Sequence, residues 1–241
     1  MQLESNQTVA EMAAQSLAAV GVFERLGIDY CCGGHRPLAE ACREKGLDPE
    51  EVQRELGAAV ASGKAVDRDW AAAPLRELAQ HIVTKHHKYL KRELPMLSER
   101  LAKVYRIYNE RYGPTLAGLP EVFEGLRSEL ESHMMKEERI LFPAIASAEQ
   151  AVATDGALPP LPFDTFASPI SMMEAEHDGA GQALAQIRET TGGFAPPEYA
   201  CTTYRALMGG LQELERDLHL HIHLENNILF PRTIELERSR K

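Results

Sequence analysis

Two stretches of the sequence repeat one arrangement of residue types that bind metal ions. Residues 133–143 and 221–231 both follow the pattern HxxxExxILFP, and each comes after a segment with an isolated histidine, His87 or His177. Imidazole and carboxylate groups are common ligands of metal ions in proteins. Chance duplication of a helix would repeat leucines more readily than this combination, so the repeat predicts a metal site.

Helical spacing places the histidine and the glutamate of each repeat on one face. Residues four apart in an α-helix lie about one turn apart, so His133 points the same way as Glu137, and His221 the same way as Glu225. Leucines share the face of His221, which indicates that this face points into the interior. Burial of a carboxylate without a partner costs several kcal/mol, and a pair of metal ions satisfies all these groups together.

The sequence therefore predicts a two-metal centre in which two glutamates bridge the metals and each metal has two histidines. Mixed imidazole and carboxylate ligands suit iron or manganese. This count leaves room for an oxo or hydroxo bridge and for at least one open coordination position. The predicted ligands are His87, His133, Glu137, His177, His221 and Glu225.

Two further carboxylates lie one helical turn before a predicted ligand. Glu129 precedes His133, and Asp217 precedes His221, by four residues. Carboxylates commonly accept the second ring N–H of a metal-bound histidine and so orient the ring. We expect Glu129 and Asp217 to have this role.

Other residues near the ligands receive simpler interpretations. Glu138 and Glu176 either line an access path to the site or are acids of the helix surface. Glu174 and His177 have the ExxH spacing of ferritin-like sites, but this spacing occurs once here, which speaks against that class. The remaining histidines are expected at the surface or in a solvated loop: His81, His86, His219, His223 and His35.

Long amphipathic helices must position the ligands. Apolar residues recur at helical spacing from Pro74 onward, and strand signals are nearly absent. The pattern predicts helices over about 74–112, 119–148, 168–191 and 197–237, with breaks at Gly113-Pro114, 155–167 and 192–197. An all-α, antiparallel four-helix bundle is the expected fold. Pro95, Pro143 and Pro231 are each expected to kink or stop a helix.

A small helical module over residues 1–62 is expected before the bundle, which spans 74–241, and residues 63–73 are expected to be a linker. Helices of the module are predicted from Val9 to Leu26, from Pro37 to Lys45, and onward from Asp48-Pro49. Trp70 is expected to pack at the junction of the two domains.

Cys31, Cys32, Gly33 and Gly34 lie in a predicted turn of this module. The glycines let a ligand or another backbone segment approach closely, whereas the alternative is two small buried residues before a flexible turn. Adjacent cysteines are poor structural cross-links, because the ring that they close is strained. The isolated Cys42 and Cys201 receive no role.

Composition excludes several classes of protein. The chain has 241 residues, of which 44% are hydrophobic and 26% charged, as in ordinary globular proteins. A formal charge of −10 makes neither nucleic acid nor an anionic membrane surface an expected partner. No apolar run approaches the ~20 residues that span a bilayer. With no secretory signal and no disulfide framework, we expect a cytoplasmic protein with reduced thiols.

Over nearly the whole chain, the sequence resembles the RIC (repair of iron centres) family of di-iron proteins. The motifs that carry this resemblance are Asp29–Gly34, residues 132–138, residues 174–178, and Leu224–Asn227 with the two ILFP ends. In that family the C-terminal part is a hemerythrin-like bundle that holds a non-haem di-iron centre. The resemblance implies that the six predicted ligands hold two iron ions, with Glu137 and Glu225 as bridges.

The resemblance also implies a function. Members of the family protect or restore iron–sulfur clusters damaged by nitric oxide or oxidants, by supplying iron or by binding nitric oxide at the di-iron site. Cys31 and Cys32 are implicated in the role of the first domain, and Glu129 and Glu176 in the site and its access channel. The expected partners are damaged iron–sulfur proteins, nitric oxide or oxygen, an unidentified electron donor, and a second copy of the chain in a homodimer.

Two alternative functions stay open at this point. One is reduction of nitric oxide to nitrous oxide at the di-iron centre, although the sequence shows no electron-donor motif. The other is a sensor that binds oxygen or nitric oxide and thereby shifts the contacts between the two domains. Oxygen-carrying hemerythrins use more histidines than the four predicted here, and more open coordination favours reactivity over reversible storage.

Overall fold

The computed structural model describes residues 7–61, 68–112, 116–157 and 160–239. Most of these residues are helical, and their extended pairing is limited to an isolated bridge between Thr8 and Pro37, so the predicted all-α class is confirmed. The predicted break at Gly113-Pro114 lies outside the described residues, and so do residues 63–67 of the predicted linker.

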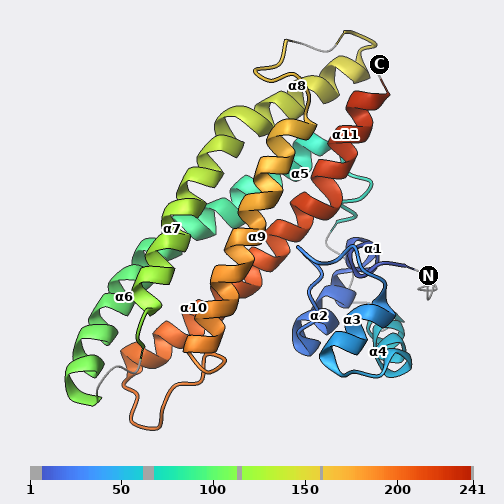
Figure 1. The fold of residues 1–241 in the computed structure, drawn as a ribbon. Helices are drawn as coiled ribbons and strands as arrows, with labels where there is room; N and C mark the ends of the chain where they lie inside the picture. Colours follow the sequence, from blue (N-terminus) through green and yellow to red (C-terminus); the bar gives the residue numbers. More distant parts are fainter. Residues whose placement is uncertain (1–6, 62–67, 113–115, 158–159, 240–241) are drawn as a thin grey trace. The chain divides into compact units, whose positions relative to one another are not determined.

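Residues 81–143 and 171–218 form one compact unit, the bundle unit. Its long helices are α6 (Lys88–Tyr112), α7 (Leu119–Lys136), most of α9 (Ala167–Thr190) and most of α10 (Thr202–Leu224). They run side by side in Figure 1. The last predicted helix begins at Thr202 rather than at 197, because residues 197–200 form a turn in which Ala200 N–H donates to the carbonyl of Pro197.

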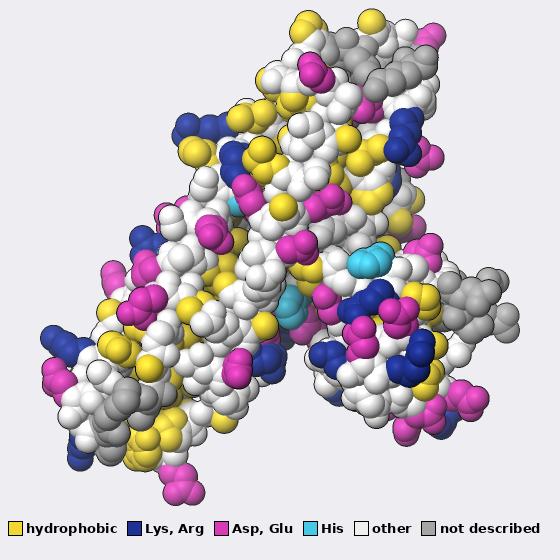
Figure 2. All heavy atoms as spheres, viewed as in Figure 1, with side chains coloured by type: hydrophobic (Ala, Val, Ile, Leu, Met, Phe, Trp, Pro, Cys, Tyr) yellow, Lys and Arg dark blue, Asp and Glu magenta, His cyan; other side chains and the backbone are white. Residues whose placement is uncertain are grey.

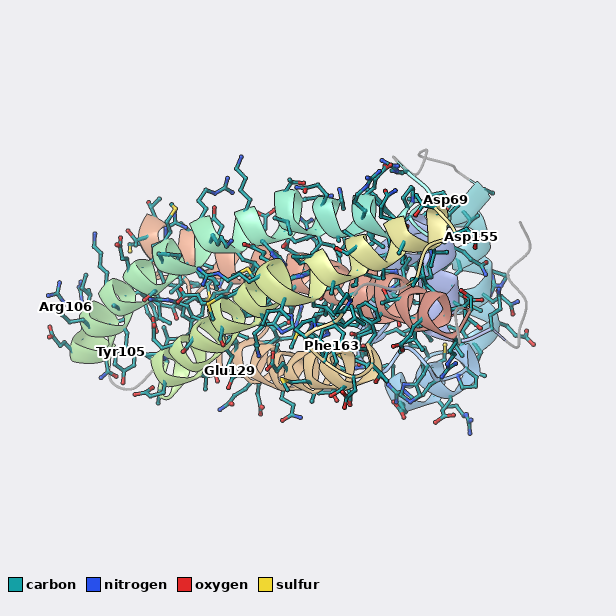
Figure 3. All side chains as sticks on the ribbon, turned by 90° about the horizontal axis from the view of Figure 1, so that it is seen from above. Asp69, Tyr105, Arg106, Glu129, Asp155 and Phe163 are labelled. Atoms are coloured by element: carbon teal, nitrogen blue, oxygen red, sulfur yellow. The ribbon has the colours of Figure 1, made fainter. Side chains whose placement is uncertain are left out.

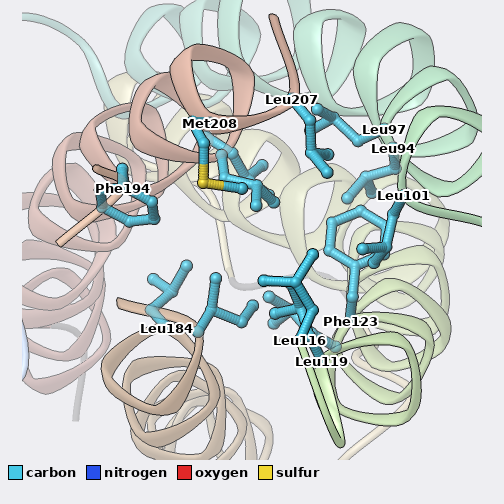
Figure 4. Close-up of a cluster of buried hydrophobic side chains, with 14 of the residues drawn as sticks. Leu94, Leu97, Leu101, Leu116, Leu119, Phe123, Leu184, Phe194, Leu207 and Met208 are labelled. Carbon is cyan, nitrogen blue, oxygen red and sulfur yellow. The ribbon is translucent and has the colours of Figure 1, made fainter. Parts of the chain in front are cut away.

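One hydrophobic core joins the four helices of the bundle unit. Leu97 of α6, Phe123 of α7, Leu184 of α9 and Met208 of α10 are all buried in it, and Figure 4 shows their side chains meeting between the helices. Burial of each such side chain contributes roughly 1.5–3 kcal/mol. The apolar periodicity of the sequence therefore gives the bundle its stability and a rigid frame for the polar residues between its helices.

In the part of the chain that the structure describes, three wider π-helical turns interrupt the long helices. They are η1 (Val83–His87), η2 (Glu137–Leu141) and η3 (Glu225–Leu229). The first ends at a predicted ligand, and the other two each begin at one. A π-turn inserts one residue into a helix and shifts the direction of the side chains after it, and such turns are frequent at functional sites. The α-helical pattern of the sequence did not predict them.

The prolines behave differently from one another. Pro143 and Pro231 each stand at the second position of a new helix, α8 (Phe142–Ala153) and α11 (Phe230–Arg238), directly after η2 and η3. Proline is tolerated in a first turn, where its missing N–H costs no helical hydrogen bond. Pro95 was expected to kink or stop its helix, and it does not stop it, since α6 continues past Pro95 to Tyr112.

The second compact unit contains Met1–Gln80, Ala144–Ile170 and His219–Lys241. Its N-terminal helices are α1 (Val9–Gln15), α2 (Leu17–Leu26), α3 (Leu38–Lys45) and α4 (Pro49–Ala61). The single helix predicted from Val9 to Leu26 is broken at Ser16, whose backbone is extended with φ −157°. Thr8 and Glu11 cap α1 reciprocally, and Pro49 opens α4 as predicted.

These N-terminal helices pack on the end of α10. Ile222 of α10 is buried in the same hydrophobic core as Phe23 and Leu56. In the same unit, the carboxylate of Glu149 on α8 accepts hydrogen bonds from the backbone N–H of Leu75 and of Arg76, and so caps α5 (Leu75–Ile82). Side chains from distant parts of the sequence thus fix the helix ends of this unit.

The surface carries mixed charge. On the face shown in Figure 2, Lys and Arg are interspersed with Asp and Glu over the helices. Within the described ranges, no helix is long and apolar enough to cross a membrane.

Candidate metal centre

All six predicted ligands are buried, none of them more than 3% exposed. They come from the ends or middles of six helical segments: His87 (η1), His133 (α7), Glu137 (η2), His177 (α9), His221 (α10) and Glu225 (η3). Burial of this many polar side chains is costly unless each has a partner. Their positions are therefore what a site built for a cation requires.

In the bundle unit, three imidazoles converge on one carboxylate. Glu137 Oε2 lies 3.3 Å from Nε2 of His87 and 3.3 Å from Nε2 of His133. The Nε2 atoms of His133 and His177 are 3.1 Å apart. A neutral imidazole presents a lone pair on its unprotonated nitrogen. Convergence of such nitrogens on a carboxylate is the donor set of a metal ion that accepts nitrogen and oxygen ligands.

The second repeat has the same local geometry in the other unit. Nε2 of His221 lies 3.0 Å from Oε1 of Glu225, as the spacing of four residues predicted. Glu225 opens η3, just as Glu137 opens η2. The two HxxxE repeats therefore share one arrangement, a histidine in the last turn of an α-helix and a glutamate at the start of a π-turn.

The ligand atoms fall into two sets, and within each set all atoms lie within 4.8 Å of one another. One set is His87, Glu137, His221 and Glu225, and the other is His133, Glu137, His177 and Glu225. Both glutamates belong to both sets, and each set has two histidines of its own. This distribution fits two metal ions that share two carboxylates.

Glu138 orients the ring of His87. Its Oε1 lies 2.8 Å from Nδ1 of His87, and Lys91 Nζ donates to the same carboxylate at 2.6 and 2.8 Å. Burial raises the pKa of Glu138, but the hydrogen bonds from Lys91 and His87 outweigh burial, and its pKa lies below the ordinary value. An ionised Glu138 accepts the Nδ1 proton of His87, so the lone pair of the ring is on Nε2, the atom that would act as a ligand.

Glu176 has the equivalent position beside His133. Its Oε2 lies 2.8 Å from Nδ1 of His133, and Lys136 donates to the other oxygen. Burial raises the pKa of Glu176, yet the hydrogen bonds from Lys136 and His133 bring it below the ordinary value. Glu129 was expected in this role and the prediction was wrong, because Nδ1 of His133 faces α9 instead of the preceding turn of α7.

Glu129 is an exposed residue of α7, labelled in Figure 3. Its carboxylate reaches toward Gly179 of α9, where an added Cβ would lie 4.0 Å from Oε2. Asp217 also differs from expectation, since its Oδ1 contacts Nδ1 of His86 at 3.0 Å. At His133, a carboxylate from a neighbouring helix thus takes the role that spacing along one helix had suggested for Glu129.

Two histidines expected at the surface are buried. His86 is fully buried and His223 is 1% exposed. His86 lies inside η1, where the inserted residue changes the direction of successive side chains and turns the neighbour of His87 inward. His223 precedes η3 and packs against Tyr30, with the two ring centroids 5.5 Å apart. His81 and His219 are partly buried, and His35 is exposed, as predicted.

The cysteine turn is organised by one carboxylate. Asp29 accepts hydrogen bonds from the backbone N–H groups of Cys31, Cys32 and Gly33 at 3.0, 3.0 and 2.9 Å. The two sulfur atoms lie 3.9 Å apart. Gly34 is required for the turn, because a Cβ there would lie 2.6 Å from the carbonyl oxygen of Tyr30. The glycines therefore serve close backbone packing within the turn itself.

The residues after Glu225 hold this turn. Asn227 Nδ2 donates to the carbonyl of Tyr30 at 2.9 Å and to Nδ1 of His223 at 2.8 Å, and Asn226 donates to the carbonyl of Cys31 at 3.4 Å. Burial lowers the pKa of His223 to about 4, against hydrogen bonds with backbone groups that raise it, so its ring is neutral at pH 7. Sequence reasoning assigned no role to either asparagine.

Comparison with known proteins adds the family context. Residues 78–233 match the family model described as "Hemerythrin HHE cation binding domain", and residues 5–60 match a domain described as "Domain of Unknown function (DUF542)". The chain is 40% identical over 230 residues to the "Iron-sulfur cluster repair protein YtfE" of Escherichia coli O17:K52:H18, covering 95% of this chain and 97% of that protein. It is 39% identical over 233 residues to the protein of the same name from Cronobacter sakazakii, covering 97% and 98%.

Proposed function

Because the chain belongs to the family of iron–sulfur cluster repair proteins named YtfE, we propose that it repairs damaged iron–sulfur clusters and holds two iron ions for this purpose. The observation that supports this proposal best is the pair of buried ligand sets that share Glu137 and Glu225. Neutral imidazoles and carboxylates are ligands that iron accepts readily.

In this proposal each residue has a stated role. His87 and His221 would hold one iron and His133 and His177 the other, and Glu137 and Glu225, which belong to both sets, would be shared between the two. Bound iron would supply open coordination positions for nitric oxide or oxygen, and a store of iron that a damaged cluster can take up. The protein orients the Nε2 atoms, which Glu138 and Glu176 do by accepting the Nδ1 protons of His87 and His133.

We further assign the approach to the site to the seam between α7 and α9. Glu176 is partly exposed and contacts the ligand His133, so it links solvent to the centre. Glu129 lies on the same seam, opposite Gly179 of α9. Both carboxylates would attract cations, which suits iron that enters or leaves.

In this proposal the domains extend over 1–62 and 74–241, and Cys31 and Cys32 receive iron or nitrosyl groups.

We place the protein in the cytoplasm, where its partners would be damaged iron–sulfur proteins and an electron donor. In this proposal two copies of the chain form a homodimer. Cys31, Cys32, Cys42 and Cys201, all within the described residues, are not joined by disulfides, which suits a reducing compartment. Reduction of nitric oxide to nitrous oxide and sensing of oxygen or nitric oxide are the alternatives. Turnover of nitric oxide with a reductant, or ligand-dependent movement without repair, would favour one of them over repair.

A repair assay tests the proposal. An enzyme whose iron–sulfur cluster has been damaged by nitric oxide is incubated with the iron-loaded protein, and its recovered activity is measured. We expect Glu137→Ala to abolish the recovery because both ligand sets lose a shared carboxylate. Glu131→Ala, at an exposed position of α7, is the matched control and should leave recovery unchanged. Full recovery with Glu137→Ala would overturn the proposal.

A further inference from the structure

The two adjacent cysteines have different surroundings. Cys31 is buried, only 6% exposed, whereas Cys32 is partly exposed to solvent. Their sulfur atoms are 3.9 Å apart, a distance at which the Cys31 thiol donates a weak hydrogen bond to the sulfur of Cys32. Cys31 is thus the buried hydrogen-bond donor of the pair, and Cys32 is the acceptor whose sulfur is closer to solvent.

The carboxylate of Asp29 is one of the groups that surround the sulfur of Cys31. Its Oδ1 lies 3.5 Å from the Cys31 sulfur and also accepts the N–H groups of Cys31 and Cys32. The hydrogen bond to Cys32, burial, and the nearby charges of Cys32 and Asp29 raise the pKa of the Cys31 thiol well above its ordinary value. Since the thiolate is the reactive form of cysteine, Cys31 is held in its unreactive form.

The backbone around the pair keeps this asymmetry in place. Gly33 N–H donates to Asp29 Oδ2 at 2.9 Å, and Arg36 Nε donates to the carbonyl of Gly33 at 3.1 Å. The carbonyl of Cys31 also accepts a hydrogen bond from Asn226. Exchange of the two sulfur positions would therefore require the turn to break several hydrogen bonds.

We propose that the two cysteines have separate roles, in which Cys32 is the thiol that reacts with electrophiles and Cys31 is a protected thiol held by Asp29. In the reaction, the sulfur of Cys32 forms a new bond to the electrophile, the leaving group departs with its electron pair, and the thiol proton passes to solvent. This assignment refines the proposed function, in which both cysteines take part, because it names Cys32 as the thiol that reacts first. The alkylation rates are measured without iron or a damaged cluster, so their outcome is distinguishable from failure of the repair function.

Site-resolved alkylation tests the assignment. The full chain is treated with a limiting amount of iodoacetamide, which releases iodide, and the reaction is quenched at intervals. Cys31 and Cys32 lie on one tryptic peptide, residues 26–43, because trypsin does not cleave the Arg36-Pro37 bond. Fragmentation of that peptide by mass spectrometry reports both rates and separates them from the rate of Cys42. We expect Cys32 to react on the order of tenfold faster than Cys31 in the folded protein. In guanidinium chloride the two rates should become similar.

Two variants distinguish a specific effect of Asp29 on Cys31 from a general destabilisation of the N-terminal helices. Asp29→Asn removes the negative charge beside the Cys31 sulfur and should raise the alkylation rate of Cys31 severalfold. Asp48→Asn is the matched control, because Asp48 caps another turn of the same module through the N–H of Glu50. It should leave both rates unchanged. Equal rates in the folded wild-type chain, faster reaction at Cys31, or an unchanged Cys31 rate in Asp29→Asn would each overturn the proposal.

Discussion

The side-chain amide of Asn227 donates a hydrogen bond of 2.9 Å to the backbone carbonyl of Tyr30. Asn227 lies two residues after the proposed ligand Glu225, and Tyr30 immediately precedes the cysteine pair. The second N–H of the same amide is used by Nδ1 of His223 at 2.8 Å. One side chain therefore ties the π-turn that carries a ligand to the turn that carries both cysteines.

Replacement of Asn227 should release the cysteine turn. Asn227→Ala leaves the carbonyl of Tyr30 without this donor, and we expect a loss of about 1–3 kcal/mol in the free energy of unfolding. Asn226→Ala removes a longer contact of 3.4 Å and should cost less. Denaturant unfolding of both variants measures the difference. A smaller loss for Asn227→Ala than for Asn226→Ala would contradict the importance of this link.

Removal of Glu176 should weaken metal retention. Glu176→Ala deprives His133 of its Nδ1 partner, and such changes typically cost 10–100-fold in metal affinity. Glu131→Ala is the matched control on α7, because Glu131 is exposed. Competition with an iron chelator gives the affinity of each variant. Similar affinities in both variants, or a larger loss in Glu131→Ala, would show that the ring of His133 is oriented differently.

Gly34 should be intolerant of a side chain. A Cβ at this position would lie 2.6 Å from the carbonyl oxygen of Tyr30 and 3.0 Å from Cβ of Ala10, so the backbone of the turn must move. We expect Gly34→Ala to lower the free energy of unfolding by on the order of 1–3 kcal/mol. Thermal or denaturant unfolding of the purified variant measures this change.

Gly57 provides the matched control for that substitution. It lies within α4, and a Cβ there would meet nothing within 4 Å. Because alanine is favoured over glycine inside a helix, Gly57→Ala should raise stability by about 0.5–1 kcal/mol. If the free energy of unfolding of Gly34→Ala were as high as that of Gly57→Ala, this result would contradict the close packing inferred for the cysteine turn.

The predictable part of the site came from repetition and spacing. The repeat predicted the ligands His133, Glu137, His221 and Glu225. Helical periodicity predicted an all-α fold, and the helices of the structure confirm it. Both regularities act within one helix, so the sequence displays them directly. The i to i+4 relation between His221 and Glu225 appears in the structure at 3.0 Å.

Contacts across helices were not predictable in the same way. A residue next to a ligand lies about 100° around the helix, so only the packing of helices decides whether Glu138 or Glu176 reaches a histidine. The π-turns add a second effect, because the inserted residue turns His86 inward beside His87. The spacing of apolar residues in the sequence predicts neither how the helices pack nor where a residue is inserted into one of them.

The most direct measurement of the proposed centre is the metal content and absorption spectrum of the protein purified without added metal. We predict about two iron ions per chain, as two sets of imidazole and carboxylate ligands would hold, and an absorption band of an oxo-bridged ferric pair. His133→Ala and His221→Ala should each abolish that band, whereas the exposed control His35→Ala should retain it. Zinc in place of iron, or a folded protein without metal, would contradict the proposed di-iron centre.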